Sequence, residues 1–376
     1  MKISAKRLLT PDGWREGLTV TIEKGVITAV ESGHDGDLSC ETLTPGLFDI
    51  HAHGGEGYYT ADLDPEALGR YLRALARHGI TDVLLTTGAF PSFDGALSLF
   101  RSAMERQAAG TLAGARIRGV HLEGPFLSPV KCGAMLPENM PKPSVEAFQR
   151  MFGPYLSIIS LATVAPEVEG AKELMTHLLR QGLRVQLGHT DAQYEEANAA
   201  FALGADSLCH SFNACRGIHH RQPGVVTSAL LSPAVYCEAI CDRKHLHPAI
   251  ITMIYRLKGP QRMIVVSDSG APTGLPDGEY VFGGKTYRVI DGTNRVKGGQ
   301  TLSGGACYID QSVANLIAVG IPSAHAYQMA SDTPAQYLGL DRLGRLCPGC
   351  QAHLAACEAD GICSFTLIGD LLTENK

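Results

Sequence analysis

The feature of this sequence that most constrains its fold is a repeated pattern, in which a short apolar run is followed by a histidine or a carboxylate. Such runs include Leu-Phe-Asp-Ile, Val-His-Leu and Ile-Val-Val-Ser. The residues that follow them are His51, His53, Glu123, His189, His210 and Asp268. Because the pattern recurs at five places in chain order, it predicts a metal site at the carboxyl ends of successive parallel strands, as in a (β/α)8 barrel.

The sequence between these residues alternates between strand-like and helix-like stretches. Asp64-Pro65 is typical of a helix start, with an N-cap and a proline at the first helical position, and Gly79 is a typical stop. We predict strands at 82–87, 116–122, 158–163, 183–188, 206–210, 235–240 and 263–267, and helices at 94–109, 170–181, 191–203 and 306–319. This alternation favours an α/β fold with a parallel sheet and crossover helices, closed or open.

Both ends of the chain have a different pattern. Leu18–Glu23 and Val26–Glu31 alternate apolar and polar residues around Lys24-Gly25, which predicts a β-hairpin. Short segments punctuated by glycine and proline return after about residue 340, and we expect them to pair with the N-terminal strands. The predicted division is a small β domain at 1–45, a barrel at 46–338 and the rest of the small β domain, a β-sandwich, at 339–376.

Composition excludes several classes of protein. The chain of 376 residues is 45% hydrophobic and 19% charged, as in soluble globular proteins. A net charge of -6 argues against a general nucleic-acid binder. The sequence has no apolar run long enough to span a bilayer, so we expect no membrane partner. Eleven scattered cysteines do not resemble a disulfide framework and predict a reduced, cytoplasmic protein.

The first two histidines form a chelating pair. His51 and His53 are two residues apart, so both side chains leave the same face of an extended strand. Glu123 is followed by Gly124-Pro125, where the chain leaves its strand abruptly, as expected for a ligand at a barrel rim. The alternative for Glu123 is a carboxylate in a salt bridge at the rim.

His189 and His210 complete the predicted ligand set. Either alone would more often be a buried histidine with its hydrogen bonds satisfied, but together with Glu123 the ligand interpretation is favoured. A mixture of imidazole and carboxylate ligands suits a divalent transition metal. We predict one or two ions, with zinc favoured and iron, manganese or cobalt as alternatives.

Asp268 has a different predicted role. A metal lowers the pKa of a bound water to about 7, which gives a hydroxide nucleophile near neutral pH. Hydrolysis of an amide then needs a group that accepts the proton and delivers it to the leaving nitrogen, and a carboxylate beside the metal does both as general base and acid. The alternative is an aspartate that caps the turn after Ser267.

Other chemistries have no signature in a suitable context. The sequence contains no Gly-x-Ser-x-Gly elbow, phosphate-binding loop or dinucleotide-binding glycine motif between a strand and a helix. A second cluster, formed by Cys347, Cys350, His353 and Cys357, is a weaker candidate for a small zinc site because its spacing fits no common zinc finger.

Several longer motifs carry a resemblance to a known family. They are Pro45-Gly-Leu-Phe-Asp-Ile-His-Ala-His-Gly54, His121-Leu-Glu-Gly-Pro-Phe126, Gly188-His-Thr190, His210-Ser-Phe-Asn-Ala214, Arg221-Gln-Pro-Gly224, Val266-Ser-Asp268 and Leu302-Ser-Gly304. Over nearly its whole length the chain resembles the amidohydrolase superfamily and, within it, the N-acetylglucosamine-6-phosphate deacetylase family.

This resemblance implies a metal-dependent (β/α)8 barrel with a small β domain built from both termini, usually in a homodimer. It implies release of acetate from an amino-sugar 6-phosphate, with Asp268 as the catalytic acid and base. Glu123, His189 and His210 match the main metal site, and His51 and His53 match a second site that some members lack. The residues that match the substrate site are Asn213, Ala214, Arg221, His245, Leu302, Ser303 and Gly304, with Arg221 reaching into the partner subunit.

Two departures from the family pattern leave the substrate open. Met135 stands where many relatives have a histidine that approaches the substrate carbonyl, and a thioether donates no hydrogen bond. Arg243 and Lys244 add two charges near the expected phosphate site. We predict deacetylation of N-acetyl-D-glucosamine 6-phosphate to D-glucosamine 6-phosphate. The alternatives are N-acetylgalactosamine 6-phosphate, an unphosphorylated amide, or a non-catalytic barrel scaffold.

Overall fold

The computed structural model describes residues 1–282, 285–298, 302–358 and 363–374. An eight-stranded parallel sheet runs through the chain, with its strands in sequence order. Its strands are β5 (Leu47–Ala52), β8 (Ile80–Thr87), β9 (Arg116–Glu123), β10 (Ile159–Val164), β11 (Arg184–Leu187), β12 (Ser207–Leu208), β13 (Tyr236–Ile240) and β14 (Met263–Val266).

Hydrogen bonds between the first and last strands close this sheet at its carboxyl end. The Asp268 N–H donates to the His51 carbonyl at 2.9 Å, and the His53 N–H donates to the Ser269 carbonyl at 2.7 Å. The strands are buried along almost their whole length, which explains why they are near-continuous apolar runs. The predicted parallel barrel is therefore confirmed.

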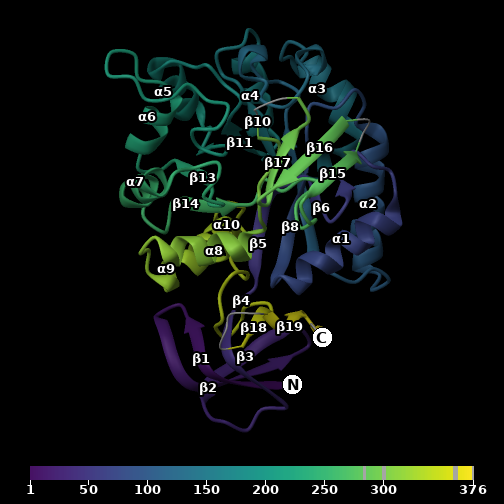
Figure 1. The fold of residues 1–376 in the computed structure, drawn as a ribbon, viewed down its shortest axis with the longest axis vertical. Helices are drawn as coiled ribbons and strands as arrows, with labels where there is room; N and C mark the ends of the chain where they lie inside the picture. The colour runs from purple at the N-terminus through teal and green to yellow at the C-terminus, as the bar shows by residue number, and fades with distance from the viewer. Residues whose placement is uncertain (283–284, 299–301, 359–362, 375–376) are drawn as a thin grey trace.

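The helices lie outside the barrel strands (Figure 1). They are α1 (Pro65–Arg77), α2 (Asp94–Ala108), α3 (Val145–Phe152), α4 (Ala171–Arg180), α5 (Tyr194–Leu203), α6 (Val225–Leu231), α7 (Pro248–Lys258), α8 (Ile309–Ala318), α9 (Ser323–Met329) and α10 (Asp332–Tyr337), with 3-10 turns η1 (Pro129–Lys131), η2 (Pro137–Asn139) and η3 (Gly153–Ile158). Helix α1 begins as predicted, because the Asp64 carboxylate accepts hydrogen bonds from the N–H groups of Glu66 and Ala67. The sequence reasoning did not predict α3, α6, α7, α9 and α10.

Strands from both termini form a second, seven-stranded sheet. Its order is β20 (Leu371–Glu374), β19 (Cys363–Ile368), β18 (His353–Cys357), β4 (Leu38–Pro45), β1 (Lys2–Thr10), β2 (Gly13–Glu23) and β3 (Val26–Ser32). The C-terminal strand β18 pairs antiparallel with β4, as expected, and the predicted hairpin is β2–β3. A separate hydrophobic core, including Ile3, Leu43 and Leu354, supports the sheet.

Figure 1 shows this terminal sheet at one end of the molecule, below the barrel, with both chain ends in it. A small sheet built from both termini is thus confirmed. The exact boundaries at 45/46 and 338/339 stay a prediction, and within the predicted C-terminal part, residues 359–362 and 375–376 lie outside the described residues.

A three-stranded antiparallel sheet follows β14 and was not predicted. It comprises β15 (Gly278–Phe282), β16 (Lys285–Ile290) and β17 (Thr293–Val296). Both turn residues between β16 and β17, Asp291 and Gly292, have positive φ, so an Asp-Gly pair was the available sequence signal. A two-stranded ribbon of β6 (Gly54–Gly55) and β7 (Tyr58–Tyr59) was missed as well.

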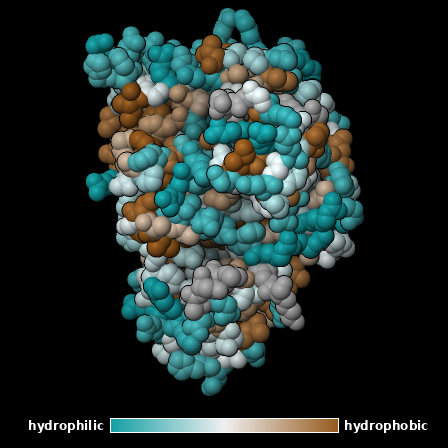
Figure 2. Space-filling model, in the orientation of Figure 1, coloured by the Kyte–Doolittle hydropathy of each residue, from teal (hydrophilic) through white to brown (hydrophobic). Residues whose placement is uncertain are grey.

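The surface in the view of Figure 1 is mainly hydrophilic, with apolar side chains in separate patches (Figure 2). Apolar residues of the barrel strands instead fill the interior. Among the described residues, no helix has both the length and the apolar character needed to cross a membrane.

Candidate metal centre

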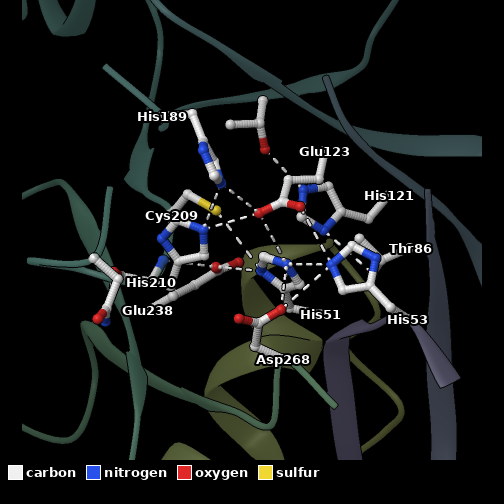
Figure 3. Close-up of polar contacts among 12 residues, drawn as sticks. His51, His53, Thr86, His121, Glu123, His189, Cys209, His210, Glu238 and Asp268 are labelled. Atoms are coloured by element: carbon white, nitrogen blue, oxygen red, sulfur yellow. Dashed lines mark hydrogen bonds and ion pairs between the residues drawn. The ribbon is translucent and has the colours of Figure 1, made fainter. Parts of the chain in front are cut away.

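The six predicted metal-site and catalytic side chains converge at the carboxyl end of the barrel (Figure 3). His51 lies within β5, His53 follows that strand directly, and Glu123 is the last residue of β9. His189, His210 and Asp268 each lie two residues beyond the end of a strand, namely β11, β12 and β14. The parallel register therefore brings together residues that are more than 200 positions apart in the sequence.

Backbone conformation aims three of these side chains inward. The φ angles of His189, His210 and Asp268 are 47°, 22° and 50°, in the left-handed region that non-glycine residues seldom adopt. Such conformations cost free energy and persist where the surrounding structure enforces them, commonly at functional sites. Here the Gly305 N–H, which donates to the Asp268 carbonyl at 2.6 Å, is one of the contacts that hold the turn.

A first group of ligand atoms surrounds Glu123. Its Oε1 lies 2.8 Å from His210 Nε2 and 3.1 Å from His189 Nε2, and these two nitrogens are 3.2 Å apart. The Nδ1 of His189 lies 2.8 Å from the Lys131 carbonyl oxygen, to which it donates. That hydrogen bond leaves the Nε2 lone pair directed at the centre of the group.

A second group lies on the other side of the same carboxylate. Oδ1 of Asp268 is 3.4 Å from His51 Nε2 and 3.3 Å from His53 Nε2. Oε2 of Glu123 is 3.2 Å from His53 Nε2, and Oε1 is 3.4 Å from His51 Nε2. Glu123 therefore contacts both groups.

The electrostatics of the cluster favour a cation at its centre. Burial raises the pKa of a carboxyl group, yet His189 and His51 hold the pKa of Glu123 well below its usual range. Burial also raises the pKa of Asp268, but the neighbouring His51 and His53 outweigh it and lower that pKa to about 2. Conversely, despite burial, Asp268 and Glu123 raise the pKa of His53 to about 9. Two ionised carboxylates thus create a negative potential where imidazole nitrogens also point.

The donor set fits a first-row transition metal. Imidazole nitrogen and carboxylate oxygen are the ligands that zinc and its neighbours prefer. Two overlapping sets of ligand atoms meet this requirement, one around His51, Glu123, Cys209 and His210 and one around His51, His53 and Asp268. Cys209 Sγ contacts Nδ1 of His51, 3.7 Å away, rather than the Nε2 that faces the cluster. We therefore assign the thiol to packing.

A pocket of about 490 Å³ opens above the cluster. Its lining includes six of the seven predicted substrate residues, which are Asn213, Ala214, His245, Leu302, Ser303 and Gly304. It also includes Phe282 of β15 and Tyr287 of β16, so the unpredicted sheet forms part of its wall. The Tyr287 hydroxyl is hydrogen-bonded to Ser303, which connects that sheet to the Leu302–Gly304 loop.

Arg221 is the predicted substrate residue that this pocket does not include. It is exposed, and its Nη1 lies 2.7 Å from His220 Nε2. Of the residues that depart from the family pattern, one lines the pocket and two do not. Met135 lines the pocket, where its sulfur accepts a hydrogen bond from the Ala89 N–H at 3.2 Å. Arg243 and Lys244 are exposed and lie outside the lining.

The Asp242 carboxylate explains how His245 is held at the pocket wall. Its Oδ2 lies 2.7 Å from His245 Nδ1 and accepts the Ala306 N–H at 3.0 Å. Its Oδ1 accepts the N–H groups of Lys244 and His245, each at 2.8 Å. Burial lowers the pKa of His245, but the contact with Asp242 outweighs it and raises that pKa above its usual value.

Sequence reasoning missed Glu238, which lies directly beneath the cluster. It is wholly buried in the middle of β13, and its Oε2 is 3.1 Å from His51 Nδ1. A carboxylate within Tyr-Cys-Glu-Ala-Ile was the available signal, since a charged residue is rare inside an apolar strand. In the second candidate zinc site, formed by Cys347, Cys350, His353 and Cys357, the histidine is not directed at the cysteines. Instead, His353 Nδ1 contacts the Asp82 carboxylate at 2.8 Å.

A parallel barrel with imidazole and carboxylate ligands at its strand ends defines a class of metal-site barrels. Residues 42–371 match the Amidohydrolase family, so the chain belongs to this metal-dependent family.

Individual relatives match over nearly the whole chain. The chain is 34% identical over 365 residues to an N-acetylgalactosamine-6-phosphate deacetylase of Escherichia coli O157:H7, covering 95% of each. It is 34% identical over 369 residues to an N-acetylglucosamine-6-phosphate deacetylase of Vibrio furnissii, covering 95% of this chain and 90% of that one.

Solved structures agree with the sequence relatives. An aspartate-to-alanine variant of N-acetyl-D-glucosamine-6-phosphate deacetylase from Mycobacterium smegmatis, in complex with N-acetyl-D-glucosamine-6-phosphate, matches with a TM-score of 0.91. Its sequence is 28% identical, and the match covers 100% of this chain and 99% of that one. The resemblance to the N-acetylglucosamine-6-phosphate deacetylases is thus confirmed.

Proposed function

We propose that the chain is a metal-dependent hydrolase that removes acetate from an N-acetylated amino-sugar 6-phosphate, with N-acetyl-D-glucosamine 6-phosphate as the preferred substrate. The observation that carries this proposal is the convergence of Glu123, His189 and His210 with the Asp268 carboxylate at the floor of one pocket. The names of the matching relatives, over almost their full length, support the same reaction.

A bound divalent metal supplies Lewis acidity and lowers the pKa of a water molecule. Glu123, His189 and His210 would hold the main ion, and His51 and His53 would hold a second. We propose zinc as the metal. The proton chemistry belongs to Asp268, whose carboxylate is ionised near neutral pH and borders the pocket. It accepts the proton of the attacking water and then donates it to the departing amine nitrogen.

The pocket recognises the sugar through a few polar groups on apolar walls. Asn213 and the Leu302–Gly304 loop offer hydrogen-bonding groups, whereas Phe90, Met135 and Phe282 provide apolar surface. No lysine or arginine side chain is present among the described residues that line it. Asp242 raises the pKa of His245 and so favours the charged imidazolium at the wall, which supports a role in holding the phosphate.

Arg221 supplies the rest of the phosphate site from a second copy of the chain in a homodimer. Its exposure and its absence from the lining of its own chain's pocket support this assignment. Ile218, which is 53% exposed on the same segment, offers apolar surface for such a contact. We further propose that the protein acts in the cytoplasm.

The second candidate substrate is N-acetylgalactosamine 6-phosphate. One specific observation favours it, namely that the relative from Escherichia coli O157:H7 with this activity is as similar to the chain as the N-acetylglucosamine-6-phosphate deacetylase of Vibrio furnissii. The two sugars differ in the configuration of one hydroxyl group, so discrimination between them depends on few contacts.

A substrate panel tests this proposal. Acetate release is measured with both N-acetylhexosamine 6-phosphates, with N-acetylglucosamine and with a simple N-acetyl amine. We expect the highest kcat/KM with N-acetylglucosamine 6-phosphate and a large loss without the phosphate. Arg221→Ala should raise KM for the phosphorylated sugar but not for the free sugar. Equal turnover of the best substrate by wild type and Arg221→Ala would refute the phosphate role.

A further inference from the structure

Glu238 is a buried acid that the deacetylation chemistry does not use directly. Its side chain is fully excluded from solvent in β13, and it does not line the pocket. A carboxylate in such a place costs several kcal/mol unless it is paired and hydrogen-bonded. Within the described part of the chain its partners are the His51 ring and the His210 N–H, both at Oε2, and Oε1 has none.

The contact with His51 determines how that imidazole is used. Oε2 of Glu238 already accepts the His210 N–H at 3.2 Å, and it acts as the acceptor towards His51 as well, so at 3.1 Å the Nδ1 of His51 carries the hydrogen. The other nitrogen, Nε2, then keeps its lone pair and faces Asp268 Oδ1, Glu123 Oε1 and His53 Nε2 at 3.3–3.4 Å. Figure 3 shows the Glu238 carboxylate to the left of the His51 ring and the Asp268 carboxylate below the ring.

The same oxygen also fixes a ligand of the first group. Oε2 accepts the backbone N–H of His210 at 3.2 Å, in a turn whose φ of 22° is strained. The Glu238 carboxylate therefore contacts His210 of the first group and His51 of the second. Its own strand, β13, supplies no residue to either group. A carboxylate that accepts the outer N–H of a metal-bound histidine increases the basicity of the ligand and fixes its orientation.

From these contacts we infer that Glu238 is a positioning residue that sets the occupancy of the second metal position, the one formed by His51 and His53 beside Asp268. The hydrogen bond from His51 Nδ1 to Glu238 orients the ring so that an ion is stabilised at Nε2. The inference rests on the metal site of the proposed function but not on its substrate, and its test measures metal binding rather than turnover.

The test compares metal binding by wild type, Glu238→Gln and Glu238→Ala. Each protein is equilibrated with Zn²⁺ buffered over a range of free concentrations, and bound zinc per chain is measured by mass spectrometry. Wild type should bind two ions. Glu238→Gln keeps an oxygen that can accept the His51 N–H but loses the charge, so the second ion should bind roughly 10–100-fold more weakly while the first is retained. Glu238→Ala should lose at least as much.

Two controls separate a positioning role from general damage to the fold. Asp82→Asn neutralises another buried carboxylate that contacts a histidine, His353. Asp82 lies near the start of β8, remote from the site, so the Asp82→Asn protein should still bind two ions. In a His51→Asn background, addition of Glu238→Gln should cause no further loss, because the proposed effect acts through His51.

The outcomes are distinct. The inference is wrong if Glu238→Gln binds both ions with wild-type affinity, if wild type binds a single ion, or if the two substitutions weaken binding independently. If wild type binds no metal at all, the proposed function itself fails. Normal metal binding by Glu238→Gln together with normal deacetylation would overturn only the inference and leave the function in place.

Discussion

At the scale of single residues, the site depends on what each side chain is prevented from doing. The Lys131 carbonyl accepts a hydrogen bond from His189 Nδ1, and the Glu238 carboxylate accepts one from His51 Nδ1. Each ring therefore has only Nε2 available for a metal. Asp268 is kept ionised by the imidazoles beside it and faces the pocket. In the proposed function, these contacts distinguish the metal ligands from the proton carrier, although all of them are carboxylates or imidazoles.

The role of Asp268 gives the first prediction. Asp268→Asn keeps the shape of the side chain but removes its ability to accept a proton. We expect kcat to fall by roughly 10²–10⁴-fold. The steady-state rate of acetate release measures the effect, and zinc content and circular dichroism serve as controls. A folded, metal-loaded variant with more than a tenth of the wild-type kcat would contradict the assignment.

His245 gives a prediction about pH. Because Asp242 raises the pKa of His245, its imidazolium persists through the usual pKa near 6.5 and is lost only as pH rises further. The KM for the phosphorylated substrate should therefore increase as the pH rises above the usual histidine pKa. His245→Asn should remove this dependence, and KM for an unphosphorylated substrate should not show it. A KM for the phosphorylated substrate that falls as the pH rises would contradict the prediction.

At the scale of elements, packing at the ends of strands positions the proposed catalytic groups. The segment Leu302–Gly305 lies against the turn that carries Asp268, because the Gly305 N–H bonds the Asp268 carbonyl. Gly305 has no room for a side chain, since a Cβ there would overlap the Ser267 carbonyl oxygen. The pocket wall and the catalytic turn are thus built as one unit.

We predict that Gly305→Ala damages activity and stability together. The added methyl group must displace backbone, which costs about 1–3 kcal/mol in a well-packed interior. The temperature of thermal unfolding and kcat should both fall. Gly153→Ala is a matched control, because a Cβ at that position meets nothing within 4 Å and the φ of Gly153 is not positive. Equal effects of the two substitutions would show that the close approach at Gly305 is unimportant.

Elements also show how far sequence reasoning extends. Parallel strands with apolar runs, and the Asp64-Pro65 helix start, are local signals and were predicted. Helices α6 and α9 are only seven residues long, and too short for a strong periodic pattern. Glu238 could not be assigned a role, because its partner His51 is 187 residues away in the sequence. Only the closed barrel brings them together.

At the scale of the whole molecule, a buried ion-pair network connects the barrel to the terminal sheet. Asp82 of β8 contacts His353 of β18 at 2.8 Å and Arg118 of β9 at 2.5 Å. Although burial opposes its charge, His353 and Arg118 hold the pKa of Asp82 well below its usual range. This network is one of the connections between the barrel and the terminal sheet, together with the hydrogen bond from the Thr366 hydroxyl to the Ala76 carbonyl at 2.7 Å.

Removal of this charge should destabilise the molecule in a pH-dependent way. Asp82→Ala leaves the Arg118 charge without its partner and should cost about 3–5 kcal/mol near neutral pH. Since the pKa is lower in the folded state, the stabilising contribution is present above about pH 4 and is lost as pH falls through the folded pKa. Denaturant unfolding of both proteins at several pH values measures this. A difference that grows toward acid pH would contradict it.

The most direct test of the proposed function is acetate release from N-acetylglucosamine 6-phosphate, measured on the same samples as their metal content. The protein is assayed as purified, after metal removal by a chelator, and after addition of Zn²⁺. We predict that deacetylation disappears with the metal and returns with it. Full turnover by the metal-free protein, or no acetate release by protein that carries metal, would contradict the account.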